Sequence, residues 1–547
     1  MKKTILLTAF IALLFLISCS KTQTDSTDIT SSKTSSTSST IDEILTDKVS
    51  FEKAYYDDYE SEEYIILDDD SESYLIMEPG IYVLSGTITQ TIVVDVGDED
   101  VRLVLDNVNI ETSENSAILI LSGDDIIISA PEGTENTLTD GSVYTAEYSD
   151  YNGTIYSECD LAFNGTGSIT INARYNNAII TKDDLLIVDV TLDITSIDDG
   201  IIGRDSLLVR NSTITIEADG DGLKATNDEV EEKGFIYIES GLINLTTEDD
   251  GIDGVTDIII YGSTLNIDSH SKGIKSDQNI YIAGGVINID STDDCINANI
   301  YVEISGGALS LDTLDDAISS DEEMIINDGE ININSCYEGI ESPSITINGG
   351  TIKIVSSDDG INVASATQTA FVPQTSSSLL LTISGGDIEI MSDGDGVDVN
   401  GSIIMTGGTL YSSGPMDDDS AIDFDGTFTL TGGTVCGMGS SQMTQAPSTS
   451  STQASIMISL SRSISAGVDI ILYDDTDNIL FQTETEKTAE NIIISLSDLT
   501  IGDSYHVAIG SQYDISFTIS SVVTYLNESG VTSGGTVFPT NPTRPPR

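Results

Sequence analysis

Short stretches of alternating apolar and polar residues run through most of the chain, and turns rich in glycine or acidic residues separate them. Residues 279–300 illustrate one unit: an alternating stretch, a turn at Gly284 and Gly285, a second alternating stretch at 286–290, and a short third one at 295–297. Alternation with a period of two is typical of β-strands, and paired glycines suit turns that need positive φ. The pattern therefore predicts three short strands per unit.

One acidic phrase marks each unit: two acidic residues, a small residue, and then Ile, Leu or Val, as in Asp249-Asp250-Gly251-Ile252. The small residues of successive copies stand at positions 178, 200, 222, 251, 273, 295, 317, 339, 360, 396 and 421. Most intervals are 22 residues, which is too short for an independent domain and is typical of one coil of a solenoid. We predict an all-β fold, a right-handed parallel β-helix with about 22 residues per coil, whose inward Ile, Val and Leu side chains stack in columns.

Changes in the pattern indicate where the parts of the chain begin and end. The stretches before residue 180 are less regular, and a polar segment after residue 440 leads into new strands. These strands are expected to cap the solenoid, because an uncapped end exposes the edge of a sheet. We expect a signal peptide at 1–19, a Ser/Thr-rich tether at 20–50, irregular first coils at 51–180, the regular β-helix at 181–440, a C-terminal β cap at 441–527 and a disordered tail at 528–547.

The first residues have the pattern of an export signal. Two lysines precede the apolar run from Ile5 to Ile17, which is short for a membrane-spanning helix. The run ends in Leu16-Ile17-Ser18-Cys19, which resembles the bacterial lipobox, whose cysteine is lipidated and becomes the first mature residue. We therefore predict an extracytoplasmic lipoprotein that Cys19 anchors to a membrane, at the cell surface; plain secretion is the alternative.

Charge narrows the choice of partners. The chain has 91 acidic and 20 basic residues, for a net charge of -71. Nucleic acid is excluded as a partner, since phosphate binding requires the opposite sign. His270 and His506 are the only histidines, so the sequence has no Cys/His cluster for zinc. The regular placement of the acidic residues indicates a bound cation instead.

Stacked coils would bring these carboxylates close together. Neighbouring coils lie about 4.8 Å apart, and two like charges at that spacing repel by roughly 1 kcal/mol in water and by more at a shielded surface. Ca²⁺, which prefers oxygen ligands, would neutralise such a row. The expected metal ligands are Asp198, Asp199, Asp221, Asp249, Asp250, Asp253, Asp293 and Asp294. The alternative for any single copy is that Asp-Asp-Gly is simply favourable turn chemistry.

Among these residues, Asp249, Asp250 and Asp253, with Asp221 from the coil before, form the strongest group, because all four could converge on one point. Four carboxylates, backbone carbonyls and water can supply the six to eight oxygens of a calcium site. A second, weaker acidic cluster is formed by Asp393, Asp395, Asp398, Asp419, Asp423 and Asp425.

The few lysines occupy informative places. Lys224, Asp253 and Lys275 take the same position in consecutive coils, and Lys272 interrupts the acidic column. Either these lysines form a ladder of salt bridges, or one of them contacts a sugar carboxylate or acts as a base. We predict Lys224, Lys275, Tyr237 and Tyr281 as carbohydrate contacts, with the two tyrosines projecting outward two coils apart.

Several stretches resemble one known family. They are Val101–Val108, Glu132–Asp140, Tyr337–Glu341, Ser357–Asn362, Ala421–Gly426 and Gln445–Ser448. These stretches are similar to the calcium-dependent parallel β-helix "carbohydrate-binding domain-containing" proteins of clostridia and other bacteria, over roughly residues 70–520. The resemblance implies bound Ca²⁺, binding of plant-type polysaccharides such as polygalacturonate and cellulose, and no established enzymatic activity.

The fold also resembles polysaccharide lyase family 9, whose calcium site uses an Asp-Asp-x-x-Asp triplet and an Asp of the preceding coil. Asp249, Asp250, Asp253 and Asp221 match that spacing. In that family a lysine about two coils further on abstracts a ring proton, whereas the corresponding coil here carries Asn297. This departure favours binding over catalysis.

We therefore expect a monomeric β-helix that holds Ca²⁺ and binds acidic polysaccharide. The alternative is a calcium-dependent lyase with Lys275 or Lys272 as its base. A third possibility is a purely structural surface protein that retains no glycan.

Overall fold

The computed structural model describes residues 50, 64–69, 71, 74–365, 379–416, 419–442 and 444–533. These residues belong to one compact unit, Lys48–Arg547. The predicted signal peptide with Cys19, the tether up to residue 49 and the tail from residue 534 lie outside the described residues. The regular secondary structure of the described residues consists of β-strands. No helix long and apolar enough to cross a bilayer is found among these residues.

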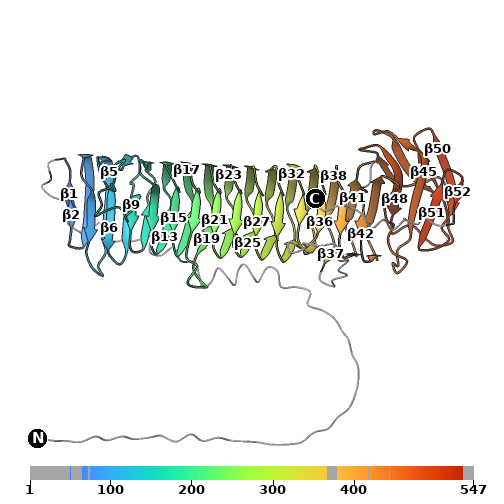
Figure 1. Cartoon of the computed structure of the whole chain (residues 1–547), viewed down its shortest axis with the longest axis horizontal. Helices are drawn as coiled ribbons and strands as arrows, with labels where there is room; N and C mark the ends of the chain where they lie inside the picture. Colours follow the sequence, from blue (N-terminus) through green and yellow to red (C-terminus); the bar gives the residue numbers. More distant parts are fainter. Residues whose placement is uncertain are drawn as a thin grey trace, which may run out of the picture. The chain divides into compact units, whose positions relative to one another are not determined.

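Each coil of the solenoid contributes three strands. In one central coil, β22 (Asp257–Ile260) forms face 1, β23 (Thr264–Ser269) forms face 2 and β24 (Ile274–Ser276) forms face 3, before β25 (Asn279–Ile282) begins the next coil. Equivalent strands pair in parallel, and the coils stack along one axis (Figure 1). A right-handed parallel β-helix with about 22 residues per coil is thereby confirmed.

Face 3 is a parallel sheet with one short strand per coil. Within the described residues its strands are β2 (Leu75–Ile76), β4 (Ile92–Asp95), β6 (Ile118–Ser122), β9 (Gly153–Ser157), β12 (Asn177–Thr181), β15 (Ile201–Gly203), β18 (Leu223–Ala225), β21 (Ile252–Gly254), β24, β27 (Ile296–Ala298), β30 (Ile318–Ser320), β33 (Ile340–Glu341), β36 (Ile361–Val363), β39 (Val397–Val399) and β42 (Asp423–Phe424). Three-residue strands joined by acidic turns place many polar side chains along this face.

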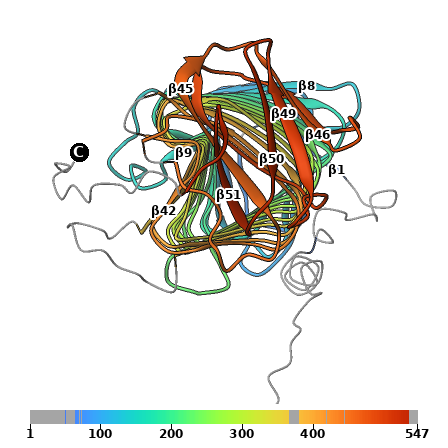
Figure 2. The same cartoon turned by 90° about the vertical axis from the view of Figure 1, so that its right-hand side faces the viewer.

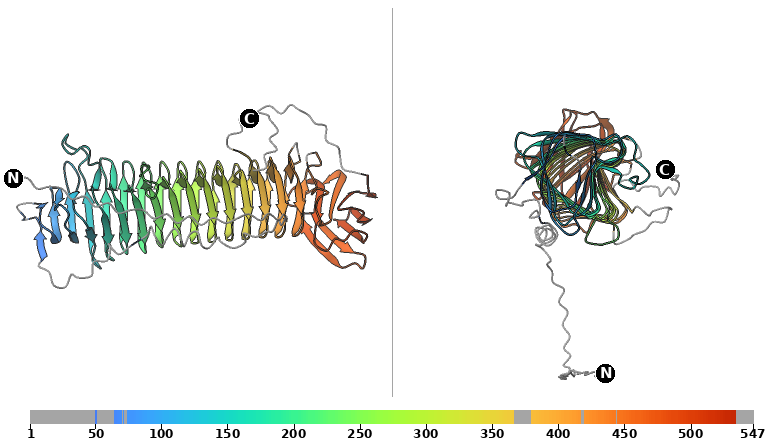
Figure 3. Two further views of the ribbon diagram at one scale, coloured as in Figure 1. Left: turned by 90° about the horizontal axis from the view of Figure 1, so that it is seen from below. Right: turned by 90° about the vertical axis from the view of Figure 1, so that its left-hand side faces the viewer.

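Faces 1 and 2 belong to one larger sheet, which begins at the end opposite the cap with the short strand β1 (Tyr64–Leu67) and the long strands β3 (Gly80–Ile88) and β5 (Val101–Glu111) (Figure 3). Face 1 continues with β7 (Ile126–Ser129), β10 (Leu161–Asn164), β13 (Asp184–Val188), β16 (Ser206–Arg210), β19 (Phe235–Ile238), β22, β25, β28 (Tyr301–Ile304), β31 (Glu323–Ile326), β34 (Ser344–Ile347), β37 (Leu380–Ile383), β40 (Ser402–Met405) and β43 (Phe428–Leu430). Face 2 continues with β8 (Glu135–Thr139), β11 (Ser168–Asn172), β14 (Thr191–Ser196), β17 (Ser212–Ala218), β20 (Gly241–Thr247), β23, β26 (Val286–Ser291), β29 (Ala308–Asp312), β32 (Glu330–Cys336), β35 (Thr351–Ser356), β38 (Asp387–Ser392), β41 (Thr409–Ser413) and β44 (Thr434–Gly439).

The core is a set of apolar columns inside the coils. Ile236, Ile258 and Ile280 occupy the same register in successive strands, and each is fully buried. Seen end-on, the coils superimpose around this interior (Figure 2). Burying one such side chain contributes about 1.5–3 kcal/mol, so the predicted inward Ile, Val and Leu columns hold neighbouring coils together.

A separate group of strands closes the C-terminal end. Its strands are β45 (Ser455–Ile464), β46 (Asp469–Asp474), β47 (Ile479–Glu484), β48 (Ala489–Ser495), β49 (Ser504–Ile509), β50 (Tyr513–Thr518), β51 (Val523–Asn527) and β52 (Gly530–Val531). Strand β48 pairs antiparallel with both β44 and β45, so the last coil has no free edge there. These strands have a hydrophobic core of their own. The predicted β cap is confirmed.

A loop inserted between β18 and β19 lengthens one central coil. The loop spans residues 226–234 at the corner between faces 3 and 1. Its Lys233 bonds the carboxylate of Asp205 and lies 3.7 Å from Asp183 Oδ1. The strands on either side keep their pairing, so the insertion leaves the register of the solenoid intact.

Candidate functional site

The acidic phrase of each coil lies in the turn between faces 2 and 3, where its second acidic residue has a definite structural task. Asp199 Oδ1 accepts a hydrogen bond from the backbone N–H of Asp221 at 2.8 Å. In the same way, Asp221 Oδ1 accepts a hydrogen bond from the backbone N–H of Asp250 at 2.9 Å, and Asp250 Oδ1 accepts one from the backbone N–H of Lys272 at 2.9 Å. A buried backbone N–H needs such an acceptor, so each carboxylate fastens the turn of the next coil.

We call this column the carboxylate ladder; its members are Asp199, Asp221, Asp250, Lys272, Asp294, Asp316, Glu338, Asp359 and Asp395. The residue three positions further on lies in the adjacent strand of face 3. Register pairing places these residues in a second column, the face 3 column, which comprises Lys224, Asp253, Lys275, Asn297, Ser319, Glu341, Asn362, Asp398 and Asp423. Each of these ladder carboxylates has a second oxygen, which does not accept the backbone hydrogen bond. This oxygen can interact with side chains of the face 3 column.

The strongest predicted metal group is assembled in part. Asp221, Asp250 and Asp253 each offer a carboxylate oxygen, and these atoms lie within 4.8 Å of one another. Asp221 is 2% and Asp250 5% exposed. Asp249 does not join them, contrary to the prediction: it stands one residue before the ladder position, and its side chain is exposed.

Two lysines flank this group, which confirms that Lys224, Asp253 and Lys275 share one column. Lys224 Nζ bonds Asp221 and lies 3.8 Å from Asp253 Oδ2. Lys275 Nζ lies 3.1 Å from Asp250 Oδ2 and 3.2 Å from Asp253 Oδ1. Burial opposes the charge on both lysines, but these ion pairs outweigh it and raise their pKa values.

Charge in this group is only partly balanced. Lys224 also lies 3.7 Å from Asp199 Oδ2. Asp199, Asp221, Asp250 and Asp253 therefore share two ammonium groups, and with all four ionised two negative charges remain. Burial raises the pKa of Asp221 to about 7 in spite of its ion pair. An all-oxygen donor set with excess negative charge fits a hard divalent cation such as Ca²⁺, which Asp221, Asp250 and Asp253 would hold.

The predicted pair Asp293 and Asp294 forms a further group, which Asp315 joins. Lys272 Nζ lies 2.8 Å from Asp293 Oδ1 and 3.0 Å from Asp294 Oδ2. This group borders a cavity of about 240 Å³. The cavity is lined by Lys272, Asp293, Asp294, Asn297, Asp315, Asp316, Ser319, Ser320, Asp321, Glu341, Pro343 and Ala364.

Asp198, the remaining predicted ligand, is engaged elsewhere. Its Oδ2 accepts a hydrogen bond from Asn176 Nδ2 at 2.7 Å. Like Asp249, it precedes the ladder position by one residue, and it belongs to none of the acidic clusters among the described residues.

Comparison with known proteins shows which family this chain belongs to. Residues 70–317 and 312–360, together more than half of the 547 residues, match the family described as carbohydrate-binding domain-containing protein. The chain belongs to this family. The resemblance to carbohydrate-binding domain-containing proteins that was inferred from the sequence is thereby confirmed.

Two proteins are similar to parts of this family member. A carbohydrate-binding domain-containing protein of Acetivibrio thermocellus is 40% identical over 119 residues, which is 20% of this chain and 41% of the relative. The chain thus spans less than half of that relative's length. The solved structure of a polysaccharide lyase-like protein from C. thermocellum, a gadolinium derivative, is 31% identical with a TM-score of 0.35, covering 43% of this chain and 96% of that one.

The tyrosines predicted as carbohydrate contacts are not surface residues in this family member. Tyr237 and Tyr281 do lie two coils apart in one column, with Ile259 between them. Their side chains are only 5% and 7% exposed, however, because this column of face 1 is apolar and buried. Burial raises the pKa of Tyr237 to about 12. Side chains this buried are not the exposed carbohydrate contacts that the sequence predicts.

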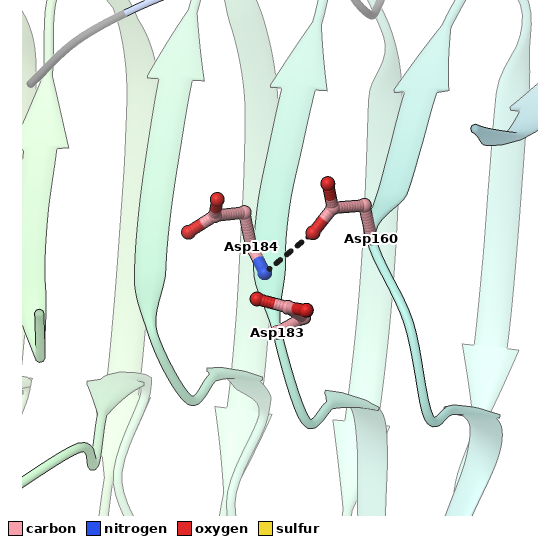
Figure 4. Close-up of side chains that lie close together, drawn as sticks. All are labelled: Asp160, Asp183 and Asp184. Atoms are coloured by element: carbon pink, nitrogen blue, oxygen red, sulfur yellow. Dashed lines mark hydrogen bonds between the residues drawn. The ribbon is translucent and has the colours of Figure 1, made fainter. Parts of the chain in front are cut away.

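The structure also assembles two acidic clusters that were not predicted from the sequence. Asp160, Asp183 and Asp184 meet at the corner between faces 3 and 1, where Asp184 N donates to Asp160 Oδ1 at 3.2 Å (Figure 4). Asp316, Glu338 and Glu341 meet along the ladder. The weaker expected cluster is represented by Asp395, Asp398 and Asp423.

A sequence signal for the ladder clusters does exist. Asp250 and Asp253, Glu338 and Glu341, and Asp395 and Asp398 are all acidic pairs three residues apart. Such a pair joins a ladder residue to its neighbour in the face 3 column. A search for adjacent Asp-Asp pairs instead also selects Asp198 and Asp249, which belong to none of the acidic clusters among the described residues.

Proposed function

We propose that the protein binds an acidic polysaccharide through Ca²⁺ held by Asp221, Asp250 and Asp253. The observation that carries this proposal is the convergence of these three carboxylates between two lysines, with negative charge in excess. A divalent cation supplies the missing charge and can coordinate carboxylate oxygens of a uronate as well as those of the protein. Polygalacturonate-like chains are the favoured ligand, and cellulose is a further candidate.

Lys224 and Lys275 would supply the second half of the recognition. Both lysines lie in the face 3 column, and their side chains are 27% and 33% exposed. When a cation takes over the charge of Asp221 and Asp250, each ammonium group becomes available to a sugar carboxylate. Absence of tryptophan argues against stacking on the flat face of crystalline cellulose.

Export and anchoring form a separate part of the proposal, which rests on the sequence of the leader. We propose a lipoprotein that is held outside the cytoplasm by lipid on Cys19 and that acts as a monomer. A Cys19→Ala variant is expected to leave the membrane fraction and appear in the medium or periplasm, whereas the wild-type protein labels with radioactive fatty acid.

Affinity gel electrophoresis tests the binding proposal. Polygalacturonate cast in the gel should retard the wild-type protein with Ca²⁺ and not with chelator. Asp250→Asn removes one charge from the cluster and keeps the shape of the side chain, so retardation should fall at least about tenfold. Asp249→Asn removes the same charge from an exposed neighbour outside the cluster and should bind like wild type.

Each other outcome has a defined meaning. Equal retardation of Asp250→Asn and wild type would refute the proposed site. If no acidic glycan retarded either the wild-type protein or a variant, a purely structural surface protein would be the remaining possibility. Steady release of unsaturated product that Lys275→Ala abolishes would replace binding by lyase activity; the raised pKa of Lys275 opposes this, since a base must be neutral.

A further inference from the structure

A row of asparagines on the outer surface of face 2 forms a hydrogen-bonded chain. Asn244, Asn266 and Asn288 occupy the same column in three successive coils, and we call them the amide row. Asn288 Nδ2 donates to Asn266 Oδ1, and Asn266 Nδ2 donates to Asn244 Oδ1, both at 2.8 Å. A side-chain amide has two N–H donors and two acceptor lone pairs. These contacts use one donor and one lone pair of Asn266, so the row is held in place with hydrogen-bonding capacity to spare.

A second polar column runs beside the amide row, two residues further along each strand. Its members are Thr246, Asp268, Asp290 and Asp312. Asp268 and Asp290 are exposed, and Asp312 is half-buried. The two columns border a groove of about 300 Å³ that extends over the four strands β20, β23, β26 and β29. From the first to the last of these coils this face 2 groove measures roughly 14 Å.

The lining of the face 2 groove indicates what kind of ligand fits there. The strands beneath it pair with neighbouring coils on both sides, so side chains must make the contacts. These side chains carry amides, hydroxyls and carboxylates, and among the described residues that line the groove none is aromatic or basic. Amides and carboxylates bond sugar hydroxyls, and bonds to the carboxylates are the stronger ones. A 1,4-linked chain of pyranose sugars advances per sugar by close to the spacing of the coils, so successive sugars would meet equivalent side chains.

Charge separates this ligand from the acidic polysaccharide discussed above. Exposed Asp268 and Asp290 would repel a uronate carboxylate, and Lys224 and Lys275, which could attract one, lie on face 3. A groove without aromatic rings also lacks the flat platform that a crystalline surface requires. The lining therefore favours a single, uncharged chain in solution.

We propose that the face 2 groove binds a single chain of an uncharged polysaccharide. The amide row and the carboxylates of Asp268 and Asp290 form hydrogen bonds with its hydroxyl groups. This site goes beyond the proposed function, because it lies on another face, takes a ligand without charge and needs no metal ion.

Affinity gel electrophoresis of the full mature chain on hydroxyethylcellulose and on mixed-linkage β-glucan tests the proposal. Both polymers are soluble and uncharged. At least one of them should retard the wild-type protein, and to the same extent with Ca²⁺ and with chelator. Asp250→Asn, which weakens the proposed Ca²⁺ cluster, should be retarded like the wild type.

Two variants probe the groove itself. Asn266→Leu keeps the size of the side chain and removes its hydrogen bonds, and Asp290→Ala removes an exposed acceptor, which places the fold at little risk. Each should weaken binding about three- to tenfold, as expected for the loss of one or two hydrogen bonds. Circular dichroism verifies that both variants are folded.

The same face provides matched controls in coils outside the groove. Asn172 Nδ2 donates to Thr139 Oγ1 at 3.1 Å, as the amides of the row donate to their neighbours, and Asp193 is exposed like Asp290. Asn172→Leu and Asp193→Ala should therefore bind uncharged glycan like the wild type.

Three results would overturn this inference: equal retardation of wild type, Asn266→Leu and Asp290→Ala; retention that requires Ca²⁺; or retention on crystalline cellulose without any on the soluble chains. Retention on polygalacturonate with Ca²⁺, but on no uncharged glycan, would sink it while leaving the proposed function intact.

Discussion

Each aspartate of the ladder has two carboxylate oxygens with different tasks. One oxygen accepts the backbone N–H of the following coil, and the other faces the column that holds the lysines and the remaining acids. A neutral side chain of the same shape can perform the first task but not the second. Substitution by asparagine and by alanine therefore separates turn architecture from charge.

Asp199 provides the clearest case. Its Oδ1 accepts a hydrogen bond from Asp221 N, and among the described residues its one salt-bridge partner is Lys224, at 3.7 Å. Asp199→Ala should be less stable than Asp199→Asn by about 1–2 kcal/mol, since the alanine leaves a buried N–H without an acceptor. Urea denaturation of both variants measures the difference. Equal stabilities would show that the hydrogen bond contributes nothing net.

Lys275 reports on charge compensation in the first cluster. Lys275→Met retains the aliphatic packing but leaves Asp250 without its ammonium partner and Asp253 with only the more distant Lys224, at 3.8 Å. In chelator its free energy of unfolding should fall by about 1–2 kcal/mol. Added Ca²⁺ should raise its melting temperature more than that of wild type, because the cation replaces the lost charge. An identical Ca²⁺ response in the two proteins would contradict this account.

Residue-level prediction succeeded where it depended only on register. Residues that stand at the same distance from the small residue of the acidic phrase in successive coils share a column. Lys224, Asp253 and Lys275, which are 29 and 22 residues apart, could therefore be aligned from the sequence. Exposure was not predictable in the same way. Tyr237 and Tyr281 occupy the outward register that alternation assigns them, but burial depends on what covers a strand, which period alone does not encode.

At the scale of the element, the turn between faces 2 and 3 repeats a conflict between charge and packing. Backbone pairing requires the acceptor to recur every coil, and this stacks carboxylates that repel one another. Lysines resolve the conflict around Asp221 and Asp294. Asp395 is only 6% exposed, and no salt bridge between described residues involves it.

Stability in the Asp395 turn should consequently depend on pH. Burial, followed by repulsion from Asp359 and Asp398, raises the pKa of Asp395 to about 9, against roughly 3.9 in an unfolded chain. The folded state binds the proton more tightly, so this contribution to stability is complete below about pH 4 and is lost as pH rises toward 9.

Asp395→Asn should therefore raise the free energy of unfolding by about 1–2 kcal/mol at pH 8 in chelator, since it removes an uncompensated buried charge and keeps the acceptor for Ser420 N. At pH 4 the variant and wild type should unfold alike. Asp387→Asn, at an exposed position, is the control. A variant less stable than wild type at pH 8 would show that the carboxylate is compensated.

For the whole molecule, the cap decides whether the solenoid ends or continues. Strand β48 pairs with β44, and apolar side chains such as Cys436 and Met438 are buried beneath the cap strands. Truncation after residue 439 should expose this edge and cause association into species larger than the calculated mass in light scattering. Removal of only residues 534–547 should not. A truncated chain that stays monodisperse would contradict the role of the cap.

The architecture as a whole was accessible from sequence because one period dominates it. Alternation assigned the strands, and the 22-residue spacing assigned their parallel stacking. The acidic sites were only partly accessible, because the first residue of an Asp-Asp pair joins a cluster in some coils and not in others. Asp293 joins one, whereas Asp249 does not and Asp253, three positions after the ladder residue, does. Which side of a tight turn a carboxylate occupies depends on local backbone angles that composition does not specify.

The loop at 226–234 shows how such a chain can change over evolutionary time. Extra residues there bulge from a corner while the strands on both sides keep their partners. A tandem duplication in the gene of one complete coil would likewise preserve every neighbouring interaction and would add one more rung of acids and lysines. Lineages could thus tune how many ions or sugar units the protein engages by gaining or losing whole coils, without redesigning its interior.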